Sequence, residues 1–219
     1  DNFDVPIIWG GVGATLQPEI AIEHADLVCV GDGEEVIIEF ADCLQNNSDW
    51  TTILGTWTRS PDGEIIQNPK RPTPSLDTIA IPNWEPRSLR YITDNKVVKH
   101  KLAFQKLTDG NYQIMTQRGC PFSCSFCVES RYQEMFGKKN SLRRRSVDLV
   151  IEELVAAKEM YDPKVLWFWD DVFTVNPRWL NDFLPKYKEK IGIPFWCYTY
   201  PTTHNFQLLK DIKEAGCNT

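Results

Sequence analysis

Cys120, Cys124 and Cys127 follow the spacing C-x3-C-x2-C in the segment RGCPFSCSFC. Three thiolates on one short loop can hold three corners of a cubane iron–sulfur cluster, which normally takes four cysteine ligands. One iron then has no protein ligand, and an open metal position is typical of sites that act on a bound molecule. The spacing therefore predicts a 4Fe-4S site in which these cysteines are both the metal ligands and the catalytic residues.

Other kinds of cysteine site remain as alternatives. A zinc site usually shows a second C-x2-C-like pair or histidines at helical spacing, and neither follows this loop. An electron-carrying cluster needs a fourth ligand, for which Cys197 and Cys217 are the downstream candidates. Together with Cys29 and Cys43 they have apolar neighbours, which favours small buried hydrophobic side chains. Seven scattered cysteines fit a reducing compartment better than a disulfide framework, so we expect a cytoplasmic protein.

The composition excludes some partners and leaves others open. No apolar run approaches the roughly 20 residues of a membrane span. The net charge of −6 argues against a broad nucleic-acid surface. A local basic cluster is either a solvated face or a dock for an acidic electron donor, such as a flavodoxin or ferredoxin, or for an anionic substrate. It consists of Lys138, Lys139, Arg143, Arg144 and Arg145.

Residues 1–50 alternate short apolar strands with helices, which predicts a parallel sheet. The expected elements are a strand at 5–9 ending at Gly10-Gly11, a helix at 18–25, a strand at 25–30 and a helix at 36–44. Residues 51–110 form a second segment. It contains a hairpin of 54–58 and 64–67 around the turn Ser60-Pro61-Asp62-Gly63, followed by a Pro-rich linker.

Residues 111–219 return to the alternation of strand and helix. The expected elements are strand 112–116, helix 146–161 with Ser146 as N-cap, strand 165–169, a helix from Pro177 that is capped by Asn176 and interrupted at Pro185, strand 194–200 and helix 206–215. The strand at 165–169 is continuously apolar, as in a sheet buried on both faces. Three strand–helix units predict the opening half of a barrel-like α/β sheet.

The residues whose side chains could bind a cofactor or take part in catalysis fall where these strands end. The cysteine loop follows the first strand, Asp170 and Asp171 follow the second, and Tyr200 ends the third. Ligands collect at the carboxyl ends of parallel strands, so one shared site is expected there. For the two aspartates, a turn or a helix cap is the structural alternative.

The cysteine segment resembles the radical S-adenosylmethionine (SAM) superfamily. The resemblance implies that the open iron is chelated by the amino and carboxylate groups of SAM and that Phe126 lies against the adenine. Asp170-Asp171 looks like the acidic pair of the cobalamin-associated branch, whose position implies contact with SAM. Tyr200 stands where many relatives have an arginine, near the same cofactor.

The N-terminal segment resembles the end of a cobalamin-binding domain. There, Gly10 and Gly11 would let the backbone approach the nucleotide tail of the cofactor, although a tight corner is the alternative use of such a pair. The Asp-x-His-x-x-Gly motif that ligates cobalt is absent, and His24, His100 and His204 are expected at the surface or as caps. The implied α/β fold is the C-terminal half of a Rossmann-like cobalamin-binding domain, followed by the first half of a partial (β/α)6 radical SAM barrel.

The resemblance also implies an activity. A reduced 4Fe-4S cluster would cleave SAM to methionine and a 5'-deoxyadenosyl radical, with cobalamin most simply carrying a methyl group to the substrate. Rearrangement or cyclisation of the substrate is possible in the same branch. An electron-carrying or structural metal module without SAM chemistry is the alternative outside it.

Overall fold

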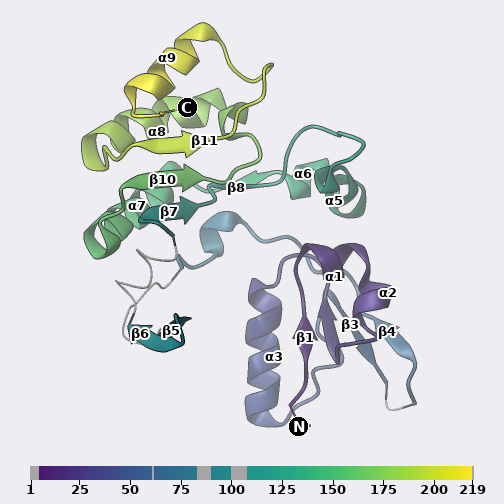
Figure 1. Ribbon diagram of the computed structural model, residues 1–219. Helices are drawn as coiled ribbons and strands as arrows, with labels where there is room; N and C mark the ends of the chain where they lie inside the picture. Colours follow the sequence, from purple (N-terminus) through teal and green to yellow (C-terminus); the bar gives the residue numbers. More distant parts are fainter. Residues whose placement is uncertain (1–4, 61, 83–89, 100–107, 219) are drawn as a thin grey trace. The chain divides into compact units, whose positions relative to one another are not determined.

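The computed structural model divides into two compact units, Asp1–Pro74 and Ser75–Thr219 (Figure 1). It describes residues 5–60, 62–82, 90–99 and 108–218. Pro61 of the expected turn and His100 lie outside these ranges. The boundaries expected at 1–50, 51–110 and 111–219 stay predictions.

The first unit contains a four-stranded sheet in the order β1-β2-β3-β4. Its strands are β1 (Ile8–Trp9), β2 (Leu27–Cys29), β3 (Thr56–Arg59) and β4 (Ile65–Gln67). The predicted parallel pair is confirmed, because β1 and β2 run parallel. The predicted hairpin is also confirmed: β3 pairs antiparallel with β2, and β4 pairs antiparallel with β3 in the same sheet.

Helices pack on both faces of this sheet because successive strand residues point in opposite directions. Leu27 and Cys29 form a core with Val36 and Phe40 of α3 (Glu34–Asn46). Val28, between them, packs against Ala14, Ala21 and Ile22. The last three belong to or follow α1 (Val12–Leu16) and α2 (Pro18–Ala21).

The single helix predicted at 18–25 is wrong in its extent. The structure has α1 before it and ends α2 at Ala21. The first of these helices is too short, at five residues, to show a helical period in the sequence. Gln17 separates the two, and Pro18 opens α2 at a position where its missing N–H has no helical partner.

The second unit is built on a parallel sheet in the order β11-β10-β7. The strands are β7 (Asn111–Ile114), β10 (Val165–Phe168) and β11 (Phe195–Cys197), and the helices between and after them are α7 (Val147–Tyr161), α8 (Pro177–Lys190) and α9 (Phe206–Glu214). The predicted alternation is therefore confirmed. A parallel bridge from Phe195 to Cys217 continues the pairing beyond β11.

Smaller elements complete this unit. They are the 3-10 helices η1 (Leu76–Thr78) and η2 (Phe173–Val175), the hairpin β5 (Arg90–Thr93) and β6 (Lys96–Lys99), the helices α5 (Val128–Phe136) and α6 (Lys138–Ser141), and the antiparallel pair β8 (Gln117–Arg118) and β9 (Arg143–Arg144). The pair β8 and β9 brings the two ends of the segment that contains the cysteine loop together.

The expectation that β10 is buried on both faces is wrong. Leu166 and Phe168 are buried, whereas Val165 and Trp167 are only partly so. The buried face packs into an aromatic core, in which the ring of Phe168 meets Phe173, Phe183, Tyr187 and Phe195. On the other face, the rings of Trp167, Trp169, Trp196 and Tyr198 contact one another.

Two details of the predicted helices change. The helix of α8 continues through Pro185, which lies on its exposed face, while Phe183, Leu184 and Tyr187 anchor the helix in the core on both sides. A carbonyl that loses its partner on an exposed face can bond to water, so the helix tolerates the proline. Ser146 occupies the N-cap position of α7, but its side chain makes no cap bond; its N–H donates to Asp77 Oδ1 at 2.7 Å.

The cap of α8 is confirmed, since Asn176 Oδ1 accepts the N–H of Trp179 at 3.1 Å. Within the described residues, no helix is both long and apolar enough to cross a membrane.

Candidate functional site

The cysteine loop runs from β8 to α5. Cys120 is buried, Cys124 and Cys127 are half-buried, and all are free thiols. Cys127 is the N-cap residue of α5, and its N–H donates to the carbonyl of Cys124 at 3.0 Å. Three thiols on one loop supply the donor chemistry that an iron–sulfur cluster requires, so the residues present fit such a group.

Among the residues that the structure describes, no group of three or more His, Cys, Asp or Glu side chains is gathered as it would be around a metal ion. The assignment of the three cysteines as ligands therefore stays a prediction.

Two carboxylates lie near the first cysteine. Burial raises the pKa of Cys120, the N–H of Phe122 opposes this, and Asp171, Glu129 and Cys127 raise the pKa further. Burial and the charge of Asp171 raise the pKa of Glu129, which accepts the N–H of Cys120. Burial also raises the pKa of Asp171. Acidic side chains beside a thiol disfavour its ionisation, so a cationic group bound there would be needed to favour the thiolate.

Gln133 braces the loop from α5. Its Nε2 donates to the carbonyls of Cys120 at 2.7 Å and Phe122 at 2.9 Å, and its Oε1 accepts from Ser123 Oγ at 3.1 Å. The side chain is buried, with only 7% of the residue exposed. Three hydrogen bonds from one buried amide fix the conformation of the first half of the loop.

Gly119 starts the loop with a close backbone approach. Its φ is +85°, and a Cβ at this position would lie 2.0 Å from the carbonyl oxygen of Ser141. Only glycine fits such a contact in this backbone conformation. The carbonyl of Gly119 accepts from Gln117 Nε2 at 2.9 Å, so the residue is held from both sides.

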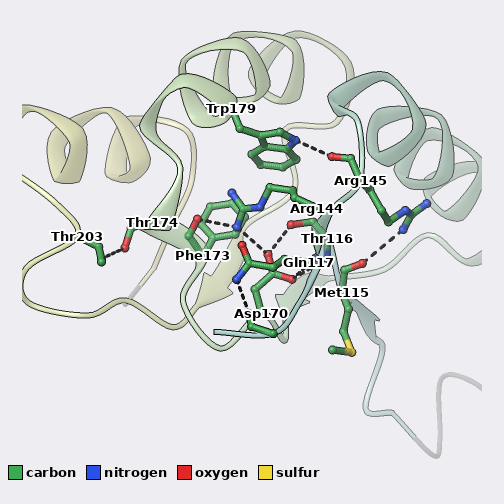
Figure 2. A network of polar contacts seen from close by, with 11 residues as sticks. Met115, Thr116, Gln117, Arg144, Arg145, Asp170, Phe173, Thr174, Trp179 and Thr203 are labelled. Atoms are coloured by element: carbon green, nitrogen blue, oxygen red, sulfur yellow. Dashed lines mark hydrogen bonds and ion pairs between the residues drawn. The ribbon is translucent and has the colours of Figure 1, made fainter. Parts of the chain in front are cut away.

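Asp170 lies at the end of β10 in a buried polar network (Figure 2). Its Oδ1 accepts the N–H groups of Thr116 at 2.6 Å and Gln117 at 3.0 Å. Its Oδ2 accepts the hydroxyl of Thr116 and faces Arg144 Nη2 at 3.4 Å. The residue is 0% exposed. Burial raises the pKa of Asp170, while Arg144 and these donors act in the opposite direction.

Arg144 extends the network to η2 and α8. Its Nη2 also donates to the carbonyl of Phe173 at 3.1 Å, and its guanidinium lies 4.6 Å from the centre of the Trp179 ring. Trp179 Nε1 in turn donates to the carbonyl of Arg145 at 2.8 Å, as Figure 2 shows. Cation–π contact and a buried carboxylate are the two partners that let an arginine leave water.

The basic cluster expected from the sequence is not one continuous surface. The side chains of Arg144 and Arg145 are only 9% and 12% exposed, and Arg145 pairs with Glu153 at 2.6 Å. Lys138 and Lys139 of the cluster are exposed. Together with the partly exposed Arg143, these two lysines are the members that could meet a partner.

Of the other predicted site residues, three lie in the second unit and two in the first. Tyr200 lies at the loop, because its ring is 4.1 Å from that of Phe122, and Phe126 is 92% exposed. Asp171 is exposed, and its charge raises the pKa of Cys120. Gly10 and Gly11 belong to the first unit, where they follow β1; a Cβ on Gly10 would lie 3.4 Å from Cys29 Cβ, and Gly11 has φ +88°.

The two downstream cysteines lie in and beside the sheet. Cys197 ends β11 and Cys217 forms the bridge to Phe195. A hydrogen bond with the Cys217 thiol, together with burial, raises the pKa of Cys197 far above its ordinary value. Each thiol thus has the other as a neighbour. His24 is exposed, and His204 lies 3.0 Å from Thr199 Oγ1 through its Nδ1.

Sequence reasoning missed Gln133, Glu129, Thr116 and Arg144. The available signals were weak. Gln133 lies six residues after the last cysteine, in a helix that has several other polar side chains. Arg144 stands in a run of basic residues, and nothing in the local sequence distinguishes the buried arginine from its neighbours.

Comparison with known proteins gives a family and several relatives. Residues 114–219 match the Radical SAM superfamily. An uncharacterized methyltransferase of Pyrococcus horikoshii is 31% identical over 223 residues, which covers 100% of this chain and 45% of the relative. Cytidylyl-2-hydroxyethylphosphonate methyltransferase of Streptomyces wedmorensis is 24% identical over 85% of this chain and 38% of its own. The anaerobic magnesium-protoporphyrin IX monomethyl ester cyclase of Rubrivivax gelatinosus is 24% identical over 98% and 38%.

Solved structures share the fold. The radical SAM methyltransferase TsrM of Kitasatospora setae, with tryptophan and a SAM analogue bound, has a TM-score of 0.70 at 21% identity, covering 98% of this chain and 40% of that one. The cobalamin-dependent SAM radical enzyme OxsB, with aqua-cobalamin and SAM bound, has a TM-score of 0.63 at 18% identity, covering 96% and 30%. The α/β fold class expected from the sequence is thereby confirmed. The chain spans less than half the length of these relatives.

Proposed function

Because the chain belongs to the radical SAM superfamily, we propose that Cys120, Cys124 and Cys127 hold a 4Fe-4S cluster with which the protein cleaves SAM reductively. The observation that carries this proposal is the loop itself: three free thiols on a backbone that a buried amide braces. When bound, the cluster and SAM would supply a one-electron cleavage to methionine and a 5'-deoxyadenosyl radical, which abstracts hydrogen from the substrate.

The protein's own residues would orient the cofactor and keep competing reactions out. The three thiolates fix the cluster, and Gln133 holds the loop carbonyls so that the thiols keep their directions. Asp171 is an exposed carboxylate next to Cys120 and would bind the amino group of SAM. The exposed ring of Phe126 is available to stack on the adenine, and Tyr200 lies beside the loop through Phe122.

The reaction proposed is methyl transfer with cobalamin. Several relatives are named methyltransferases, and the TsrM and OxsB structures are described with cobalamin. In the first unit, Gly10 and Gly11 end β1 in a turn where a cofactor could approach the backbone. The Rubrivivax relative is a cyclase, which favours cyclisation as the second candidate reaction.

An electron donor is also required, and a flavodoxin or ferredoxin would meet the exposed lysines Lys138 and Lys139. The electron-carrier alternative needs a fourth thiolate at the loop. The Cys197 and Cys217 thiols are instead hydrogen-bonded to each other, which weighs against that alternative.

The test is anaerobic reconstitution with iron and sulfide, reduction with dithionite, and electron paramagnetic resonance with and without SAM. We expect a 4Fe-4S signal that shifts when SAM is added. Cys124→Ala should lose the signal. The control Cys43→Ala, which changes a cysteine of the first unit that donates to the carbonyl of Asp49, should keep it. A cluster whose signal does not change when SAM is added would favour the electron carrier. A protein that binds zinc and no iron would exclude both the SAM-cleaving enzyme and the electron carrier.

Cobalamin is tested separately by adding hydroxocobalamin and following tryptophan fluorescence. Gly10→Ala adds a methyl group at ordinary contact distance from Cys29, so the fold should hold. We expect weaker cobalamin binding, by about tenfold, because the backbone can no longer be approached closely. Equal affinity in the variant would remove Gly10 from the cofactor site.

A further inference from the structure

We propose that Asp170 and Arg144 are positioning residues that hold the start of the cysteine loop, and that only Asp171 of the acidic pair is available to the cofactors. This inference rests on the proposed function, since it assigns the loop's geometry to a purpose. It divides the pair Asp170-Asp171, which the sequence presents as one feature, into two separate roles.

The first step is that Asp170 has no capacity left for a ligand. Both of its oxygens accept from Thr116 or Gln117, and the second also faces Arg144. The residue is fully buried, so a ligand would have to displace these donors to reach it. Leaving buried N–H groups unpaired is costly, which makes such a displacement unfavourable.

The second step is the short path from Asp170 to the first cysteine. Asp170 fixes the N–H of Gln117, and the side chain of Gln117 donates to the carbonyl of Gly119 at 2.9 Å. Cys120 is the next residue. The carboxylate at the end of β10 is therefore linked through Gln117, labelled in Figure 2, to the carbonyl that precedes Cys120, and this link fixes the direction in which the backbone enters the loop.

The third step concerns Arg144. Its guanidinium balances the buried charge of Asp170 and ties it to the carbonyl of Phe173 and to the Trp179 ring. A neighbouring cation adds a charge-assisted interaction to a carboxylate that already accepts three hydrogen bonds, and so restricts its motion further. Arg144 thus joins η2 and α8 to the support of the loop.

The fourth step is the contrast with Asp171. It is exposed rather than buried, so its carboxylate is accessible to a ligand. Adjacent residues that leave a strand point to opposite sides, which is the physical reason for the division. One carboxylate is buried in the protein, and the other is exposed at the end of the same strand.

The experiment measures amide hydrogen exchange of the metal-free protein, so that it does not depend on cluster chemistry. Two double variants isolate the acceptor oxygen: D170A/R144M and D170N/R144M. Both remove the buried charges, but only the second keeps an oxygen for the N–H groups of Thr116 and Gln117. We expect peptides covering 116–127 to exchange about tenfold faster in D170A/R144M and to recover most of their protection in D170N/R144M.

Peptides of α7 serve as the reference in every variant, because a general loss of stability would accelerate them equally. Asp171→Ala is the matched control: the loop should exchange within about twofold of the wild type, while the response of the reconstituted cluster to SAM is reduced. Equal exchange rates of the loop peptides in the two double variants would overturn the inference. An exchange rate in Asp171→Ala as high as that in D170A/R144M would overturn it as well.

Thr116→Val provides a milder variant if D170A/R144M does not fold. It removes only the hydroxyl that Asp170 accepts and nearly preserves the shape of the side chain. An increase of about threefold confined to the loop is expected, and unchanged exchange there would contradict the proposal. If the signal of the wild-type cluster does not change when SAM is added, the proposed function is wrong, but none of these exchange rates is affected. The failure of the proposed function can therefore be distinguished from the failure of this inference.

Discussion

The two sheets end their strands in different ways. In the first unit, β1 ends at Gly10-Gly11, and β2 ends before Gly31, whose N–H donates to Thr15 Oγ1 at 3.0 Å. In the second unit, the ends of β7 and β10 are joined by the buried carboxylate of Asp170 and its donors. Glycine turns leave space for a ligand beside the backbone, whereas a buried network fills that space and fixes the chain.

The ion pairs of the two units also differ, in how far their acidic partners are exposed to solvent. Arg71 of the first unit meets Glu35 at 2.8 Å and Glu39 at 2.5 Å, and both glutamates are about half exposed. In the second unit, the Arg144–Asp170 pair is buried. The comparison teaches that Arg71 of the first unit pairs with solvated carboxylates, while Arg144 of the second pairs with a carboxylate inside the protein, which orders the loop that carries the cysteines.

The largest effect should follow from breaking the buried pair. Arg144→Met leaves Asp170 as an unpaired buried charge and should cost the second unit about 3–5 kcal/mol of unfolding free energy. Urea unfolding followed by hydrogen exchange reports each unit separately. Arg131→Met is the control, because its pair with Glu134 is exposed and should contribute at most about 0.5 kcal/mol. Loss of stability in the first unit instead would break the comparison.

A second prediction concerns the amide inside the loop's support. Gln133→Met keeps the volume but leaves the carbonyls of Cys120 and Phe122 without their donor, and should cost about 1–3 kcal/mol. Exchange of loop peptides and the urea midpoint measure it. Gln207→Met, in an exposed pair with Asp211, should have little effect. Equal effects of the two changes would show that burial of the amide does not matter.

The first unit offers the opposite test, in which a charge is created at a strand end. Burial, together with Glu34 and Asp32, raises the pKa of Cys29 from 9.0 to about 11. A group whose pKa is raised in the fold stabilises it below the unfolded pKa, and this contribution is lost as pH rises through the folded pKa. Between pH 9 and 11, the wild type should therefore lose about 1–3 kcal/mol relative to Cys29→Ala. Parallel pH curves of unfolding free energy would contradict this.

The smallest effect should come from the ion pairs of Arg71 with Glu35 and Glu39. Arg71→Met should cost the first unit about 1 kcal/mol or less, since both glutamates remain solvated. The cost should shrink further in 1 M salt, which screens exposed charges. Differential scanning fluorimetry at two salt concentrations measures it. A cost as large as that of Arg144→Met, or one independent of salt, would remove the distinction between the units.

Much of the fold followed from the period of apolar residues. The parallel pairs, the hairpin β3–β4 and the helices α3, α7 and α9 were predictable because each presents a repeated pattern over several residues. The helix α1 was not, since one turn carries no period. The continuity of α8 through Pro185 depended on which face the proline occupies, and the local sequence does not state this.

The candidate site was predictable only where it is contiguous in sequence. The cysteine spacing stands in ten successive residues, whereas Thr116 and Asp170 lie 54 positions apart and Gln133 reaches back 13 to Cys120. Such contacts depend on how the elements pack, and similar Asp, Gln or Arg residues occur elsewhere at the surface. The sequence also could not divide Asp170 from Asp171, because the division depends on which carboxylate meets the ends of β7.

The close approach of Gly119 to Ser141 bears on whether the cysteine motif can be transplanted. The ten-residue segment contains the donor atoms, but the groups that shape it lie outside it: the Ser141 backbone, the Gln133 amide and the Asp170 carboxylate. A synthetic peptide of residues 118–127 would therefore bind iron as a flexible chelator. A graft into another scaffold would need a glycine-sized gap, a buried amide and a buried acid at matching places before it reproduced this loop.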